Sequence, residues 1–499
     1  MALIPITPKA GIVKNGTDYS NKGRWVDGNL VRFRNGYLGP IGGWQKLRNT
    51  ALDGTPIGMY SYNTNSGNAV LAVGTRQKVY VFYNSSWYDI TPSGFVNDES
   101  LDPLGFGAWQ FGKEDFGDAR SQSGLNFGSQ SFSFDNWGEE LVFCFAGDGK
   151  IYRWQPSSPS TIAAPITNAP LNNLAVIVSN ERHLFAIGSA NDSRKIAWSD
   201  RENNTNWTSK ATNTAGDLII PSGGEALYAT KFRSDIMVFT DIGLNRVYYT
   251  GSPFVYGIAE AGTNCKTISV RSIVQAGNFI AWLGENSIFI YDGTVREIPC
   301  EVHDYIFDDL NSEHRRNSWG GHNQNFNEIW WGFPTGANQE TANKYVIWNY
   351  KDNTWSIGEL NRTAWEDQGV LDFPVATDSS GFVYEHEVGV LFNSPDLGTT
   401  KPFCKSGPLE IAQGEKLVQV NQIIPDEEAG SLPGVTISFT GKFTPLGSET
   451  DFGSFSFEND GYTDARFTAR QVQMKIEGST TQDFKVGNIR LNAKTRGKR

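Results

Sequence analysis

Methionine and cysteine are both scarce in this sequence, with 4 of each among 499 residues. The runs of Leu, Ala, Glu and Lys that favour long helices are also missing. The cysteines stand far apart without a CxxC pair, which argues against a structural zinc site and against a disulfide scaffold. We therefore expect reduced thiols, no metal and no cofactor; the cysteines are Cys144, Cys265, Cys300 and Cys404.

The sequence also has no excess of basic residues, and its formal net charge is −11. A protein that binds nucleic acid by neutralising phosphates needs clustered Lys and Arg, so this class is disfavoured. The sequence contains no run of about 18 apolar residues, so it predicts no membrane-spanning helix. Because Pro5 and Pro8 interrupt the first residues, we do not expect them to act as a signal peptide. We expect a protein that is made in a cytoplasm.

Aromatic residues and glycine are abundant. The chain has 15 Trp, 18 Tyr and 31 Phe, together 13 % of its residues, and 53 Gly. Aromatic and β-branched side chains suit a pleated, half-buried surface, whereas Gly and Asn suit tight turns. This composition predicts an all-β protein with many short strands.

Six segments repeat one pattern: an apolar strand, a short turn, an aromatic-rich strand and an Asp, Asn or Gly turn. Their spacing of about 40 to 60 residues predicts a β-propeller with about six blades. In KIAWSDRENNTNW (195–207), a polar turn separates Trp198 from Trp207, and we expect the two indoles to cover adjacent blade surfaces; WNYKDNTW (348–355) repeats this arrangement. The six segments start at Asn68, Glu139, Asn180, Ser234, Asn278 and Asn327.

The pattern changes twice along the chain. Residues 95–132 are rich in Gly, Phe and Asp without periodicity, which indicates a loop insertion between two blades. From about residue 408, apolar and polar residues alternate with period two, as in sheets with one wet face. We predict an N-terminal arm that completes the ring (1–50), a β-propeller (51–407) and a separate C-terminal β-sandwich (408–499).

Candidate catalytic or metal-binding residues do not form a known signature. In Glu385-His386-Glu387, a strand would place His386 opposite the two acids, so we interpret it as structural. The sequence has no Walker A loop, Rossmann fingerprint, nucleophile elbow or sialidase-type Asp box. We expect no enzyme and no metal site; the scattered candidates are His303, His314, His322, Asp135, Glu139, Glu140, Asp200, Asp304, Asp308 and Asp309.

Three stretches together resemble a known class of virion proteins. They are NKGRWVDGNLVRFRNGYLGPIGGWQKL from Asn21, FDNWGEELVFCFAGDGKIYRW from Phe134 and GFVYEHEVG from Gly381. With the C-terminal strands, they are similar to tail hub or nozzle proteins of short-tailed bacteriophages, the tubular protein B-like class also called packaged-DNA stabilisation proteins. The resemblance implies a homohexameric ring below the portal and adaptor that contacts tail fibres, forms the distal DNA-ejection conduit and retains packaged DNA.

We therefore expect a structural protein of the virion tail that is assembled in the host cytoplasm. DNA is expected to pass along this protein without specific binding. Arg32 and Arg34 share one strand face and are predicted at a subunit interface, where Arg is favoured. A carbohydrate-binding or carbohydrate-hydrolysing propeller carried on a virion remains the alternative. The insertion supplies the candidate gate residues Phe106, Trp109, Phe111 and Phe116.

Overall fold

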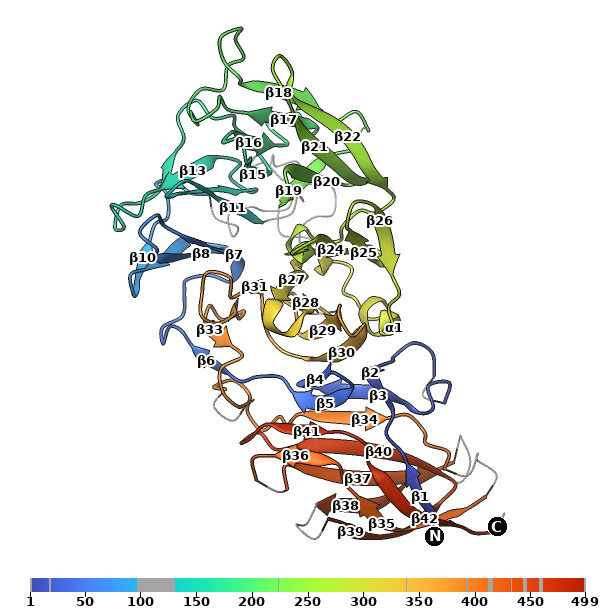
Figure 1. Ribbon diagram of the computed structural model, residues 1–499. Coiled ribbons are helices and arrows are strands. Elements are labelled where there is room, and N and C mark those ends of the chain that lie inside the picture. Colours follow the sequence, from blue (N-terminus) through green and yellow to red (C-terminus); the bar gives the residue numbers. More distant parts are fainter. Residues whose placement is uncertain are drawn as a thin grey trace, which may run out of the picture.

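The regular secondary structure of the described residues is almost entirely β-strand, and the predicted all-β propeller fold is confirmed (Figure 1). In the described residues the only α-helix is α1 (His303–Phe307). No helix among them has the length and apolarity that a membrane crossing requires. The computed structural model describes residues 2–17, 19–96, 131–222, 224–337, 339–391, 394–411, 416–431, 433–442, 447–456 and 461–497.

In the residues that the structure describes, seven four-stranded antiparallel sheets form the blades around a central channel (Figure 1). Blades one to four consist of β7 (Pro56–Asn63), β8 (Ala69–Thr75), β9 (Val79–Tyr83) and β10 (Ser86–Asp89); β11 (Phe132–Trp137), β12 (Glu140–Phe145), β13 (Ile151–Trp154) and β14 (Ala164–Pro165); β15 (Ala175–Val178), β16 (Leu184–Ile187), β17 (Lys195–Trp198) and β18 (Gly216–Ile219); and β19 (Ala226–Phe232), β20 (Asp235–Thr240), β21 (Gly243–Gly251) and β22 (Val255–Thr263).

The last three blades close the ring. Blade seven takes its outermost strand from the N-terminal part of the chain, because β6 pairs with β33. The three blades consist of β23 (Val274–Ala276), β24 (Phe279–Leu283), β25 (Ile288–Tyr291) and β26 (Val295–Ile298); β27 (Trp319–Asn323), β28 (Glu328–Phe333), β29 (Lys344–Asn349) and β30 (Thr354–Glu359); and β31 (Ala364–Glu366), β32 (Val375–Thr377), β33 (Val383–His386) and β6 (Trp44–Lys46).

The blade count exceeds the expected six by one. Each of the six predicted segments falls in one of the first six blades. Blade seven lacks the repeated pattern because its strands have only three or four residues and come from two distant parts of the chain. The prediction that the N-terminal part completes the ring holds for β6 alone.

The second strand of each blade is buried on both faces, which explains the near-continuous apolar runs. In β8, β12, β20 and β28, nearly every side chain is buried. A strand covered by a neighbouring blade on each face cannot carry the alternating pattern of a half-exposed sheet. Separate apolar clusters lie between successive blades, and one of them joins Val375 and Val383 of blade seven to Leu71 and Val73 of blade one.

The second part of the molecule is a β-sandwich to which both ends of the chain contribute. Its sheets share one apolar core with strands of blades five and six. The sheet orders are β2-β3-β34-β40-β37-β38, β1-β42-β35-β39 and β36-β41-β5-β4. The strands are β1 (Ala2–Pro5), β2 (Lys9–Ile12), β3 (Arg24–Asn29), β4 (Val31–Arg34), β5 (Tyr37–Pro40), β34 (Phe403–Ser406), β35 (Val418–Ile424), β36 (Glu427–Ala429), β37 (Val435–Lys442), β38 (Thr450–Ser456), β39 (Thr463–Ala469), β40 (Gln471–Gly478), β41 (Phe484–Val486) and β42 (Arg490–Thr495).

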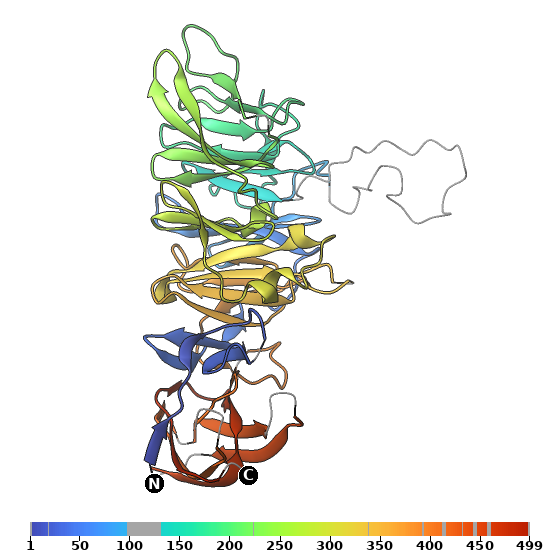
Figure 2. The ribbon, with the colours of Figure 1, turned by 90° about the vertical axis from the view of Figure 1, so that its right-hand side faces the viewer.

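This arrangement corrects the predicted domain boundaries. Residues 2–40 belong to the sandwich rather than to an arm of the propeller, and β34 precedes the expected boundary at residue 408. The period-two pattern identified the C-terminal strands, of which β37 alternates between buried and half-buried residues. Two of them pair with distant strands, β42 with β1 and β41 with β5, so local periodicity could not reveal the pairing. Figure 2 shows the sandwich stacked below the propeller, with both termini in it.

Candidate functional site

Arg32 is buried at the junction between sandwich and propeller, which corrects its expected place at a subunit interface. Its side chain is 6 % exposed and comes from β4. The guanidinium donates from Nη1 to Glu387 Oε2 (2.9 Å), and from Nη2 to Glu387 Oε1 (2.5 Å) and Glu328 Oε2 (3.1 Å). Glu328 begins β28 of blade six, and Glu387 follows β33 of blade seven. All these contacts lie within one chain.

Two carboxylates face a single guanidinium in this cluster. The pKa of Glu328 is raised to about 7, chiefly by burial and also by the charge of Glu387, against the opposing effect of Arg32. Burial lowers the pKa of Arg32, but the two carboxylates outweigh burial and the net shift is upward. With a pKa near 7, Glu328 can take up a proton close to neutral pH, which reduces the excess negative charge of this buried cluster.

Arg34 shares a strand face with Arg32, as expected. Both guanidinium groups lie over the ring of Phe326, at 3.7 Å for Arg32 and 5.4 Å for Arg34. Arg34 is exposed, unlike Arg32. Its place at a subunit interface therefore stays a prediction.

A second buried cluster holds the closing strand β6 in blade seven. Arg362 donates from Nε to His386 Nε2 (2.9 Å) and from Nη1 to Asp396 Oδ2 (2.8 Å). Trp44 of β6 stacks on the His386 ring at 5.3 Å and donates to Asp396. Burial and the nearby Arg362 charge hold the pKa of His386 well below its usual range. His386 is thus a neutral acceptor with a structural role.

The other candidate residues are dispersed. Glu385 accepts from Gln45 at 2.7 Å, whereas Glu387 binds Arg32, so neither joins His386. His303 contacts the Asn286 carbonyl and His322 contacts Asp367. In the part of the chain that the structure describes, no three His, Cys, Asp or Glu side chains are placed to hold a metal ion.

The turn in KIAWSDRENNTNW joins two blade interfaces, as predicted. Trp198 belongs to the apolar cluster between blades three and four, and Trp207 packs on the cluster between blades two and three. Asp200 accepts from the backbone N–H groups of Thr214 and Arg201, both at 2.9 Å, so its role is to shape the turn. In the second such stretch, Trp348 and Trp355 instead lie opposite each other on one face of a hairpin.

The predicted gate residues Phe106, Trp109, Phe111 and Phe116 lie outside the described residues. The two ends of the insertion are described and meet between blades one and two. The Phe95 and Phe132 rings stack with centroids 6.3 Å apart.

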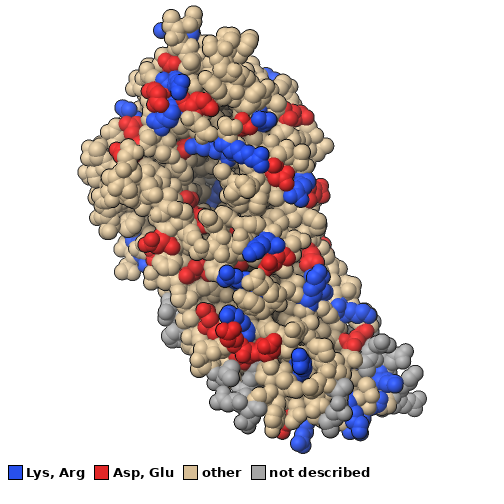
Figure 3. All heavy atoms as spheres, viewed as in Figure 1, with Lys and Arg blue, Asp and Glu red and all other residues tan. Residues whose placement is uncertain are grey.

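The central channel contains a cavity of about 470 Å³, and the innermost region of every blade contributes to its wall. Figure 3 shows the hollow in the propeller face, with acidic and basic side chains interspersed around it. Most charged groups of the wall are paired within the chain. Lys231 lies 2.8 Å from Asp135, His322 Nδ1 lies 2.8 Å from Asp367, and Arg271 donates to the Thr363 carbonyl.

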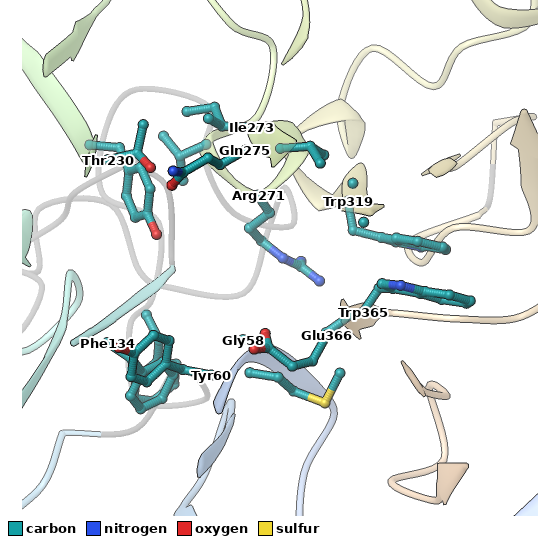
Figure 4. Close-up of a pocket in the computed structure, with 18 of the residues that line it drawn as sticks. Gly58, Tyr60, Phe134, Thr230, Arg271, Ile273, Gln275, Trp319, Trp365 and Glu366 are labelled. Atoms are coloured by element: carbon teal, nitrogen blue, oxygen red, sulfur yellow. The ribbon is translucent and has the colours of Figure 1, made fainter. Parts of the chain in front are cut away.

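Two stacked indoles form one side of this wall (Figure 4). The Trp319 and Trp365 rings are nearly parallel, with centroids 6.1 Å apart. Gly321 permits this packing, because a Cβ there would lie 2.2 Å from the Trp365 ring. Next to Trp365, the Glu366 side chain points into the cavity (Figure 4).

Glu366 was not among the residues singled out from the sequence. Its pKa is raised to about 7 by burial, against two hydrogen bonds from Ser61 that lower it. Its strand β31 has only three residues, so no periodicity assigns Glu366 to a channel. Asp135 was considered as one acid among many, and its place on β11 brings it to the same wall.

Comparison with known proteins adds no family. No family model matches the chain, and no curated protein matches it. Similar solved structures include a streptogramin B lyase (12 % identity, 69 % of this chain and 96 % of the lyase, TM-score 0.40), the β-propeller domain of Myceliophteria thermophila Cps50 (11 %, 70 % and 99 %, 0.40) and Moraxella catarrhalis BamB (9 %, 69 % and 97 %, 0.36). These likenesses concern the fold alone, which the sheet order establishes independently.

Proposed function

We propose that this protein is a structural subunit of the tail of a short-tailed bacteriophage, of the hub or nozzle class, and that it works as a homohexameric ring in the virion rather than as an enzyme. One observation carries the proposal. Two of the three stretches on which the sequence resemblance rests, 21–47 and 381–389, are far apart in the chain and meet in the structure.

The contact between these stretches is extensive. Strand β6 pairs with β33 in the register Trp44 with His386, Gln45 with Glu385 and Lys46 with Tyr384. Arg32 of the first stretch binds Glu387 of the second. The residues that carry the resemblance thus build the joint between propeller and sandwich, which supports a common architecture over a chance similarity of turns and aromatic strands.

The joint between propeller and sandwich connects the two parts firmly, as a structural subunit of a tail requires. The chain crosses between the two parts more than once, and β2, β3 and β4 lie against β30 of blade six. A DNA conduit in this proposal lies between copies of the subunit, because a cavity of about 470 Å³ has the size of a small-molecule pocket. Adaptor proteins and tail fibres are the proposed partners of the ring.

Light scattering on the size-exclusion peak tests the proposal. Six copies of the 55.2 kDa chain give a ring of about 330 kDa. We expect this mass at high protein concentration, and we expect Arg34→Glu to weaken the assembly. Lys351→Glu, the same charge reversal at another exposed residue, is the matched control. A chain that stays monomeric at every concentration would contradict the ring.

A further inference from the structure

The channel holds a carboxylate for which the described part of the chain provides no cationic partner. Glu366 Oε1 accepts hydrogen bonds from Ser61, from the backbone N–H at 3.0 Å and from Oγ at 2.7 Å. Within the described residues, Oε2 has no hydrogen-bond partner and no Lys, Arg or His forms an ion pair with this carboxylate. The side chain points into the cavity (Figure 4). Glu366 is half-buried, and partial burial of this carboxylate, together with the charge of Asp367, raises its pKa to about 7.

A phenol on the channel wall is also unpartnered. The Tyr228 hydroxyl has no hydrogen-bond partner in the part of the chain that the structure describes. Burial, followed by the charges of Asp135 and Glu366, raises its pKa to about 12. Burial, Asp135 and Glu366 also raise the pKa of Tyr60. Both tyrosines therefore experience the negative potential of the two acids.

The cations in the wall do not neutralise Glu366. Lys231 binds Asp135, and the Arg271 guanidinium donates to a backbone carbonyl. The next acid on the strand, Asp367, adds a further negative charge near Glu366 and is itself bound to His322. The titratable and charged groups of the wall, one element after another, are Tyr60, Asp135, Tyr228 and Lys231, Arg271, His322, and Glu366 and Asp367.

We propose that the channel is a binding site for a small organic cation with a primary ammonium group, which pairs with Glu366 and is oriented by the Tyr228 hydroxyl. Such a ligand supplies the missing counter-ion. The half-buried rings of Tyr60, Phe134 and Tyr228 line the same cavity and favour a cation over a neutral ligand. The cavity volume accommodates an alkylammonium ion. This site is independent of the proposed tail function.

Isothermal titration of the full chain with n-butylammonium at pH 8 tests the site. We expect saturable binding, at least tenfold weaker binding to Glu366→Gln, and weaker binding to Tyr228→Phe. Glu385→Gln, the same change at an exposed hydrogen bond, should bind as the wild type does. The neutral isostere n-butanol should bind at least tenfold more weakly than the ammonium ion.

The pH dependence separates charge pairing from general apolar binding. Because the bound cation requires ionised Glu366, lowering the pH from 8 to 6 should weaken binding about tenfold and release a proton at pH 6. Glu366→Gln should lose both effects. The proposal would be overturned if n-butanol bound as tightly as n-butylammonium, or if a neutral sugar competed equally well. It would also be overturned if Glu366→Gln kept the wild-type affinity. The same holds if n-butylammonium at 20-fold molar excess showed no binding to protein at about millimolar concentration.

Discussion

Buried ionisable side chains define this protein at the residue scale. Arg362 has a fully buried side chain and lies over the rings of Trp44 and Tyr384. Its Nε–H needs a neutral acceptor, and unprotonated His386 supplies it. Protonation of His386 would place two cations side by side without water, which links the closure of blade seven to pH.

Acidification should therefore destabilise the wild type through His386. The folded pKa lies well below the unfolded value of about 6.5, so below that pH the unfolded chain binds a proton that the folded chain does not. The contribution is complete above pH 6.5 and falls by up to about 1.4 kcal/mol per pH unit as the pH drops. The measurement is the urea-unfolding free energy from pH 7.5 to pH 5.

His386→Gln keeps an acceptor without the titration and should show a shallower pH dependence. His314→Gln, a change at a half-buried histidine whose side chain has no hydrogen-bond partner within the described residues, should retain the wild-type slope. Identical slopes for His386→Gln and wild type would show that His386 does not titrate as described.

At the scale of elements, strands from opposite ends of the chain are joined by the Arg32 cluster. β4, the start of β28 and the end of β33 meet there. Gly42 and Asn323 donate further hydrogen bonds to Glu387, both at 3.0 Å. Removal of the guanidinium leaves two acids buried beside each other.

Arg32→Met should destabilise the protein by about 3–5 kcal/mol, because it leaves uncompensated carboxylates at a buried site. Urea unfolding measures the change. The double variant Arg32→Met/Glu387→Gln should recover part of the loss, since one of the two acids is then neutral. Arg34→Met, on the same strand but exposed, is the matched control and should change little. An Arg32→Met protein as stable as the wild type would refute the cluster's role.

The isolated fragment 408–499 should not fold, contrary to the expectation from its alternating pattern. It lacks β1, which pairs with β42, and it lacks β34, which pairs with β40. It also lacks β3, the other neighbour of β34 in the same sheet. A chain that joins residues 1–41 to 403–499 by a short Gly-Ser linker should fold, because Asn29 pairs with Phe403 and the backbone of Ile41 binds Leu30. Circular dichroism and thermal melting distinguish the two fragments. A cooperative transition in 408–499 alone would contradict the shared sheets.

Local pattern predicted those parts of the fold that are local. Apolar strands and aromatic hairpins gave six blades, and the turn after Trp198 lies where its residues indicated. Blade seven, the N-terminal sandwich strands and the Arg32 cluster depend on contacts between segments that lie far apart in the chain, 355 residues for Arg32 and Glu387, and one sequence carries no periodic signal for such contacts. The sequence did not predict a role for Glu366, because its environment is assembled from different blades.

The whole molecule is a stack of propeller and sandwich with charges of both signs on the face in Figure 3. Its formal charge of −11 is carried by every copy of a ring. A conduit must bind DNA weakly, because each neutralised phosphate adds affinity and slows exit.

The assembled protein should therefore show no measurable binding to duplex DNA at physiological salt, where charges are screened beyond about 8 Å. Fluorescence anisotropy of a labelled duplex, titrated with protein at low and physiological salt, is the measurement. Tight binding with a steep salt dependence would indicate a basic inner surface and would reject a conduit along which DNA slides freely.

We propose that this chain is a ring-forming component of a phage tail. Electron microscopy of virions from the phage that encodes it, labelled with an antibody against the chain, tests this claim most directly. We predict label at the distal part of the tail, on a six-fold ring that the purified protein also forms. Virions without label, or label confined to the head, would contradict the account.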